Sequence, residues 1–179
     1  MYWKTSGPAN TLGTIKLALE TATTKNIKDI VVASCSGQTA LLLAGKTSNL
    51  VCVSHAQGFV DPGTNEMSET MRSDLITKEI KVLTTTHLLS GAERGISRKF
   101  GGAYPIEIMA HTLRMLGQGV KVCVEIAVMA LDAGLVPFGK EIIAIGGSSK
   151  GADTAVIIRP GHASNIFDTY ISEIICKPK

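Results

Sequence analysis

At 179 residues, with 45% apolar and 18% charged residues, the chain has the composition of a globular protein with a sizeable core. Its net charge of +3 at pH 7 is small and spread along the sequence, which argues against a nucleic-acid binder. No apolar run approaches the roughly 18 residues that a membrane-spanning helix needs.

These features predict a single domain over residues 1–179, with no membrane and no nucleic-acid partner. The first residues, MYWKTSGPANT, lack the apolar core of a signal peptide, so a cytoplasmic location is expected. Cysteines stand at positions 35, 52, 123 and 176, and none forms a CxxC pair. We therefore expect a reducing compartment and no metal site.

Helical and strand-like segments alternate along the chain. Helices are expected over residues 14–26, 37–47, 67–79, 105–117 and 119–134. Strands are expected over residues 27–34, 50–55, 80–87, 140–147 and 153–160. Residues 119–134 also alternate like a strand, but their length favours a helix. Residues 88–104 contain four glycines and are expected to form a long loop, and residues 170–178 are a candidate for a short extra strand.

The connection lengths predict the topology. Helical segments separate the first four strands, which is the pattern of a parallel sheet covered on both faces. Only GSSKGA separates the fourth and fifth strands, so the fifth is expected to pair antiparallel with the fourth. The predicted fold is a three-layer α/β/α sandwich. Its mixed five-stranded sheet has the order 3-2-1-4-5.

Two loops rich in glycine and serine are predicted to meet where the winding reverses, between the first and fourth strands. They are SCSGQT, Ser34 to Thr39, and GGSSKGAD, Gly146 to Asp153. Hydroxyl groups, a helix N-terminus and Lys150 would suit a phosphate. The alternative for the first loop is that Ser34 or Ser36 only caps the helix. Neither GxGxxG nor GxxxxGK[ST] is present.

Several other residues have more than one reading. Cys35 is either a reactive thiolate at a helix start or a small core thiol. His55 and His87 end strands, where they either face the cleft or form structural hydrogen bonds. Glu125 lies in a very apolar segment and needs a partner if it is buried. Arg94 and Arg98 close over an anion, contact another subunit or belong to a solvated basic loop, which leaves a homo-oligomer open.

Several stretches of the sequence resemble a known family. SCSGQTA after a strand is similar to the loop of the pyruvate kinase C-terminal domain that holds the 6′-phosphate of a sugar bisphosphate activator. The stretches HLLSGAERGISRKFGG, VKVCVEIAVMALDAG, GGSSKGADTAVIIRP and SEIICKP resemble stand-alone archaeal and bacterial proteins with a pyruvate-kinase C-terminal-like fold. Members of that family have carried flavin mononucleotide, and their activity is unassigned. Gln38 stands where the kinase loop usually has arginine.

The resemblance implies a flavin mononucleotide (FMN) cofactor whose phosphate lies at the helix start after the first strand. The residues expected at the ligand are Ser34, Cys35, Ser36, Gly37, Gln38, Thr39, His55, Thr86, His87, Ser90, Gly91, Arg94, Gly146, Gly147, Ser148, Lys150, Gly151, Asp153 and Thr154. No catalytic residue is assigned, and whether the protein is an enzyme is left open. The alternative function is a non-catalytic regulatory or sensing domain that binds a phosphorylated metabolite.

Overall fold

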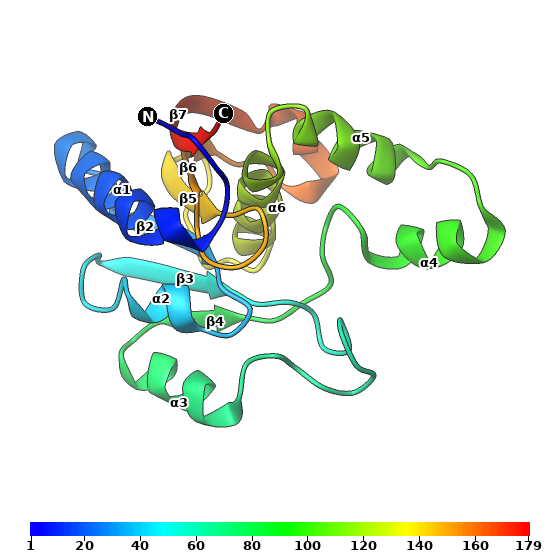
Figure 1. The fold of residues 1–179 in the computed structure, drawn as a ribbon, viewed down its shortest axis with the longest axis horizontal. Coiled ribbons are helices and arrows are strands. Elements are labelled where there is room, and N and C mark those ends of the chain that lie inside the picture. Colours follow the sequence, from blue (N-terminus) through cyan, green and yellow to red (C-terminus); the bar gives the residue numbers. More distant parts are fainter.

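The protein is built on one mixed sheet that is longer than predicted. A computed structural model describes residues 1–179 and has seven strands in the order β1-β7-β6-β5-β2-β3-β4 (Figure 1). The strands are β1 Tyr2–Trp3, β2 Asp29–Ala33, β3 Asn49–Val53, β4 Lys81–Leu83, β5 Ile142–Gly146, β6 Thr154–Arg159 and β7 Tyr170–Pro178. The prediction of a five-stranded sheet is therefore wrong, although the five predicted strands are neighbours as β4-β3-β2-β5-β6.

Strand directions follow from the connections. β2 pairs parallel with both β3 and β5, and β3 pairs parallel with β4. β6 pairs antiparallel with β5, from Ile142 opposite Ile158 to Gly146 opposite Thr154. The short segment between β5 and β6 leaves no room for a crossover helix, so this part of the prediction is confirmed.

The two added strands cover the edge that β6 would otherwise leave open. β7 pairs antiparallel with β6 through two register irregularities, and β1 pairs parallel with β7. The ammonium group of Met1 donates to the Ile175 carbonyl at 2.7 Å, and the Trp3 ring nitrogen donates to the Asp153 carbonyl at 2.8 Å. β1 pairs only with the last residues of β7, Lys177 and Pro178, so it caps the end of that strand. A two-residue strand has no periodicity that could predict it.

Helices cover both faces of the sheet (Figure 1). Alternate strand residues such as Ile30 and Val32 pack with α1, α2 and the segment leading into α3, while Val31 faces α6. The helices are α1 Thr11–Lys25, α2 Gln38–Leu41, α3 Glu69–Thr77, α4 Gly91–Phe100, α5 Pro105–Arg114 and α6 Gln118–Asp132, with short 3-10 turns η1 Pro8–Asn10 and η2 Ala163–Asp168. None of these helices has the length and apolar character that crossing a membrane would require.

α4 corrects the predicted loop over residues 88–104. Ser90 precedes the helix and Gly101, with a φ of 72°, follows it. Glu93 in the first turn and Arg98 and Lys99 in the last turn suit the helix dipole. The glycines wrongly indicated a loop. Gly95 is exposed within the helix, and a glycine there costs only about 1 kcal/mol, so it does not prevent the helix from forming. α2 is also shorter than predicted, since it ends at Leu41.

α6 is a helix, as predicted, and approaches the sheet very closely at Gly119. A β-carbon at Gly119 would lie 2.0 Å from the Thr154 hydroxyl oxygen. The facing Gly146 is also crowded, because a β-carbon there would lie 2.8 Å from the Gly119 carbonyl oxygen. Two glycines thus let the N-terminal turn of α6 rest on β5 and β6.

Gly119→Ala should lower the free energy of unfolding by about 1–3 kcal/mol, because the added methyl group overpacks this contact. Gly95→Ala in α4 is the matched control, since no atom lies within 4 Å of a β-carbon there. The control should gain about 0.5–1 kcal/mol from helix propensity. Urea unfolding of both variants measures the two changes. Equal effects at the two sites would contradict the close approach.

Candidate functional site

Two adjoining cavities lie at the carboxyl edge of the parallel strands. The larger has a volume of about 800 Å³ and the smaller about 250 Å³. The residues that line both are Ala33, Cys35, His55, Gln118 and Val122. Together they form one cleft at the point where the winding reverses between β2 and β5, which is where open α/β sheets bind ligands.

A third cavity, of about 700 Å³, lies at the opposite edge of the sheet around Arg159 and Tyr170. The sheet has no reversal of winding that opens there, and the glycine- and serine-rich loops lie at the other edge. We therefore place the candidate site in the carboxyl-edge cleft.

The larger cavity brings the two glycine- and serine-rich loops together. Ser36 lines it from the loop after β2, and Gln38 and Thr39 line it from the start of α2. The loop after β5 contributes Gly147, Ser148, Ser149, Lys150 and Gly151. Lys150 is exposed and takes part in none of the ion pairs of the chain. Hydroxyl groups and a free ammonium group therefore surround the same space.

Ser34 has a capping role in this loop. Its hydroxyl oxygen accepts hydrogen bonds from the backbone nitrogens of Thr39 at 3.1 Å and Ala40 at 3.3 Å. The side chain is buried, and α2 is a single turn of four residues. The structure thus bears out the capping alternative for Ser34, whereas Ser36 and Gln38 remain exposed at the cavity.

Three rings form one wall of the smaller cavity. The His55 ring stacks on Phe59 with centroids 3.8 Å apart and an interplanar angle of 28°. His87 lies 5.3 Å from each of them. Burial lowers the pKa of His87, against the raising effect of nearby Glu125, so this imidazole favours its neutral form. A flat ligand can contact these rings.

Cations also line the smaller cavity. Arg94, Arg114 and Lys121 line it together with a single carboxylate, Glu125. The Arg114 side chain donates to Gln118 at 2.7 Å, but the buried Nε of Arg94 has no hydrogen-bond partner. A buried polar atom without a partner is unfavourable, so this guanidinium is suited to a ligand oxygen. Arg98 is exposed and lines neither cavity, and its role in a subunit contact stays a prediction.

Lys121 and Glu125 form a buried ion pair one helical turn apart on α6, with each side chain 7% exposed. The other Glu125 oxygen accepts the backbone N–H of Leu89 at 2.8 Å. Burial lowers the pKa of Lys121, and the Glu125 charge opposes this effect. Glu125 thus has the partner that its apolar surroundings required.

Cys35 lies between the two cavities as a neutral thiol. Burial raises its pKa to about 11, and the nearby Glu66 charge acts in the same direction. A backbone hydrogen bond from His55 has the opposite, smaller effect. The interpretation of Cys35 as a thiolate activated by the helix start is therefore not supported at neutral pH.

Some residues predicted at the ligand have other surroundings. Asp153 is fully buried and accepts hydrogen bonds from Gly7 at 2.9 Å, Ser148 at 3.3 Å and Thr154 at 2.8 Å. It fastens the second loop to the N-terminal segment. The predicted residues that line neither cavity are Gly37, Thr86, Gly91, Gly146, Asp153 and Thr154.

Other lining residues were missed from the sequence. Those with polar, charged or aromatic side chains are Thr11, Ser54, Phe59, Glu66, Arg114, Gln118, Lys121, Glu125 and Ser149. The four-residue spacing of Lys121 and Glu125 within an apolar helix was a usable signal of a buried pair. Phe59 and Glu66 belong to a long segment between β3 and α3, and nothing local indicates that it folds back over the cleft.

The fold and its cleft define a class: a doubly wound α/β domain with a polar cleft at the reversal of its winding. The family model described as pyruvate kinase, alpha/beta domain matches residues 13–158. The chain belongs to that family.

Proposed function

We propose that the protein binds flavin mononucleotide in the carboxyl-edge cleft. The supporting observation is the continuity of two different cavities: one is lined by hydroxyl groups and Lys150, the other by rings and cations. FMN has the same two parts, a phosphate on a ribityl chain and a flat isoalloxazine ring. The larger cavity, at about 800 Å³, also has the size of a typical small-molecule pocket.

The phosphate would lie in the larger cavity. Ser36 and Gln38 approach it from the start of α2, and Ser148 and Lys150 approach it from the loop after β5. α2 has one turn, so its dipole contributes little and the ammonium group of Lys150 supplies the main charge. Gln38 stands where the related kinase loop usually has arginine. It can still donate a hydrogen bond to the phosphate, but it adds no second positive charge.

The ring would lie in the smaller cavity, against His55 and Phe59. The unpartnered Nε of Arg94 is an observation that fits such a ligand, because the carbonyl oxygens of the isoalloxazine ring accept hydrogen bonds. Cations near the pyrimidine side of a flavin favour its reduced, anionic form. Bound FMN would supply the redox chemistry, while the chain orients the ring and sets the local charge.

A second candidate is a sensing domain that binds a phosphorylated metabolite without chemistry. It is favoured by the family, whose description names a domain of pyruvate kinase, and by the mainly polar lining of the larger cavity. In this case the larger cavity would hold the phosphate of the metabolite, and another polar group of the same metabolite would fill the smaller cavity.

The absorption spectrum of the protein as purified separates the two candidates. FMN binding predicts a yellow protein from which acid releases FMN, and an apo-protein whose unfolding temperature rises on addition of FMN. A colourless protein that FMN does not stabilise would contradict this proposal. Stabilisation by a sugar bisphosphate, and not by FMN, would support the sensing domain.

A further inference from the structure

A thiol, an imidazole and a carboxylate converge on one side of the larger cavity. Cys35, His55 and Glu66 each direct one ligand-type atom to a place where all three atoms lie within 4.8 Å of one another. They come from three separate segments: the loop after β2, the second residue after the end of β3, and the long loop before α3. All three line the larger cavity.

Cys35 differs from the other cysteines of the chain. Cys52, Cys123 and Cys176 are buried in the core, whereas Cys35 is half-buried at the cavity. Its sulfur is thus the one cysteine sulfur that an ion could reach from the cleft. Sulfur, nitrogen and carboxylate oxygen are together the donor set of zinc, while magnesium and calcium prefer oxygen alone.

We propose that Cys35, His55 and Glu66 bind a divalent transition-metal ion, preferably zinc, with a fourth position open to the cavity. Tetrahedral zinc holds such ligand atoms about 3.3–3.6 Å apart, so side-chain shifts of about 1 Å would close the site. The ion would take the place of the hydrogen bond that now joins His55 Nδ1 to Glu66. Binding would release the thiol proton, because thiolate is the form that ligates zinc.

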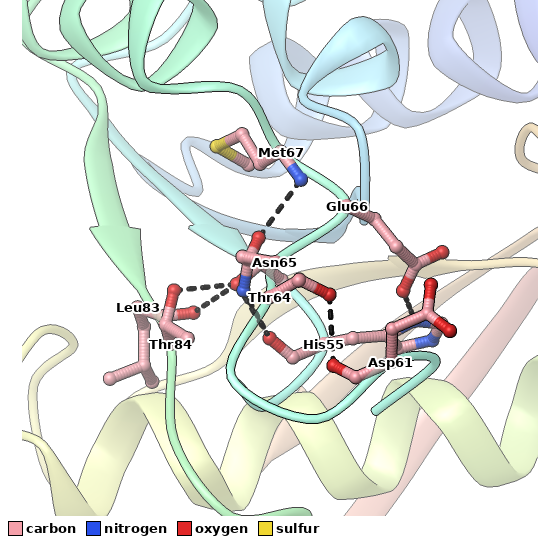
Figure 2. Close-up of polar contacts among 9 residues, drawn as sticks. His55, Asp61, Thr64, Asn65, Glu66, Met67, Leu83 and Thr84 are labelled. Atoms are coloured by element: carbon pink, nitrogen blue, oxygen red, sulfur yellow. Dashed lines mark hydrogen bonds and ion pairs between the residues drawn. The ribbon is translucent and has the colours of Figure 1, made fainter. Parts of the chain in front are cut away.

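The surroundings hold two of the ligands in place. Asn65 donates to the His55 carbonyl at 3.2 Å and accepts the Met67 backbone N–H at 2.9 Å, which fixes the loop on both sides of Glu66. Figure 2 shows this loop folded so that Glu66 faces the His55 ring. Stacking on Phe59 fixes the ring plane of His55. Such support is what orients ligands in metal sites.

The ligand charges also suit the ion. A thiolate and a carboxylate carry two negative charges, which balance a divalent cation. Arg94, Arg114 and Lys121 line the adjoining cavity, whereas Lys150 shares the larger one. Three protein ligands and one open position are the arrangement of catalytic zinc sites, where water or a ligand oxygen completes the shell. The metal site does not rest on flavin binding, because all three ligands belong to the chain.

Titration with Co²⁺, which replaces zinc spectroscopically, tests this proposal on the full chain freed of metal by a chelator. We expect intense visible bands of tetrahedral cobalt and a near-ultraviolet thiolate-to-cobalt charge-transfer band, both removed by added Zn²⁺. Cobalt that stays octahedral, or that shows no charge-transfer band, would overturn the proposal.

Variants give a second measurement. Cys35→Ser should abolish the charge-transfer band, and the exposed Glu66→Gln should weaken zinc binding by more than the roughly 10- to 100-fold that loss of an outer-shell partner costs. His162→Gln is the matched control, because His162 also pairs with a carboxylate, Asp132 at 2.7 Å, without a thiol. An equal loss of zinc affinity in this control would mean that the metal binds adventitiously, and it would overturn the proposed site.

Thiol chemistry provides a readout that needs no spectroscopic metal. In the folded protein Cys35 is the cysteine open to a disulfide reagent. Zn²⁺ should protect it in the wild type and leave it reactive in Glu66→Gln. Equal reaction rates with and without Zn²⁺ in the wild type would contradict the proposal.

Discussion

Replacing Glu125 with alanine should lower the free energy of unfolding by about 3–5 kcal/mol. The change would leave the ammonium group of Lys121 buried without its partner, in a cavity that Arg94 and Arg114 also line. It would also remove the acceptor of the Leu89 backbone N–H. Urea unfolding followed by circular dichroism measures the loss.

A double variant separates charge from packing at this pair. Lys121→Met with Glu125→Gln removes both charges, while the glutamine oxygen can still accept the Leu89 N–H. Buried ion pairs replaced by neutral groups often cost little, so the double variant should stay within about 1 kcal/mol of the wild type. If it lost as much as Glu125→Ala, packing would explain the effect and the electrostatic account would be wrong.

Removing a positive charge at either end of the cleft should change the affinities for FMN and for riboflavin, which lacks the phosphate, in different ways. Lys150→Ala should weaken FMN binding about ten- to a hundredfold, the cost of one hydrogen bond to a charged group, and leave riboflavin binding unchanged. Arg94→Ala should weaken the binding of both FMN and riboflavin, because the unpartnered Arg94 Nε lies at the ring end of the cleft. Flavin fluorescence quenching measures each affinity.

Lys140→Ala is the control for these variants, because Lys140 is also exposed but precedes β5, at the opposite edge of the sheet from Lys150. It should change neither affinity. A loss of riboflavin binding in Lys150→Ala, equal to its loss of FMN binding, would contradict the assignment of the phosphate to the larger cavity.

The sheet was largely predictable because its signals are local. β-branched runs predicted the five strands, and the length of GSSKGA decided the antiparallel pairing of β6. α4 was not predicted, because Gly91, Gly95 and Gly101 resemble loop punctuation while the helix is supported by tertiary contacts. Glu107 accepts the Ser97 hydroxyl at 2.7 Å, and Glu93 accepts the Glu107 backbone N–H at 3.1 Å. Such contacts between α4 and α5 are not visible in the sequence.

The part of the candidate site whose position follows from the strand order was predictable. Parallel strands put the loops after β2 and β5 at one edge, so the meeting of Ser36 with Lys150 followed from topology. The approach of Glu66 to Cys35 did not, because a long irregular segment carries it there. The capping role of Ser34 and the fastening role of Asp153 also depend on hydrogen bonds that residue type alone does not fix.

The cleft is proposed to recognise a flavin through its phosphate. The most direct test is the ratio of riboflavin to FMN dissociation constants for the wild-type apo-protein, measured by calorimetry in one buffer without phosphate. Contacts from Lys150 and the serine hydroxyl groups predict FMN binding at least about ten times tighter than riboflavin binding. Equal affinities, or no binding of either flavin, would contradict this account.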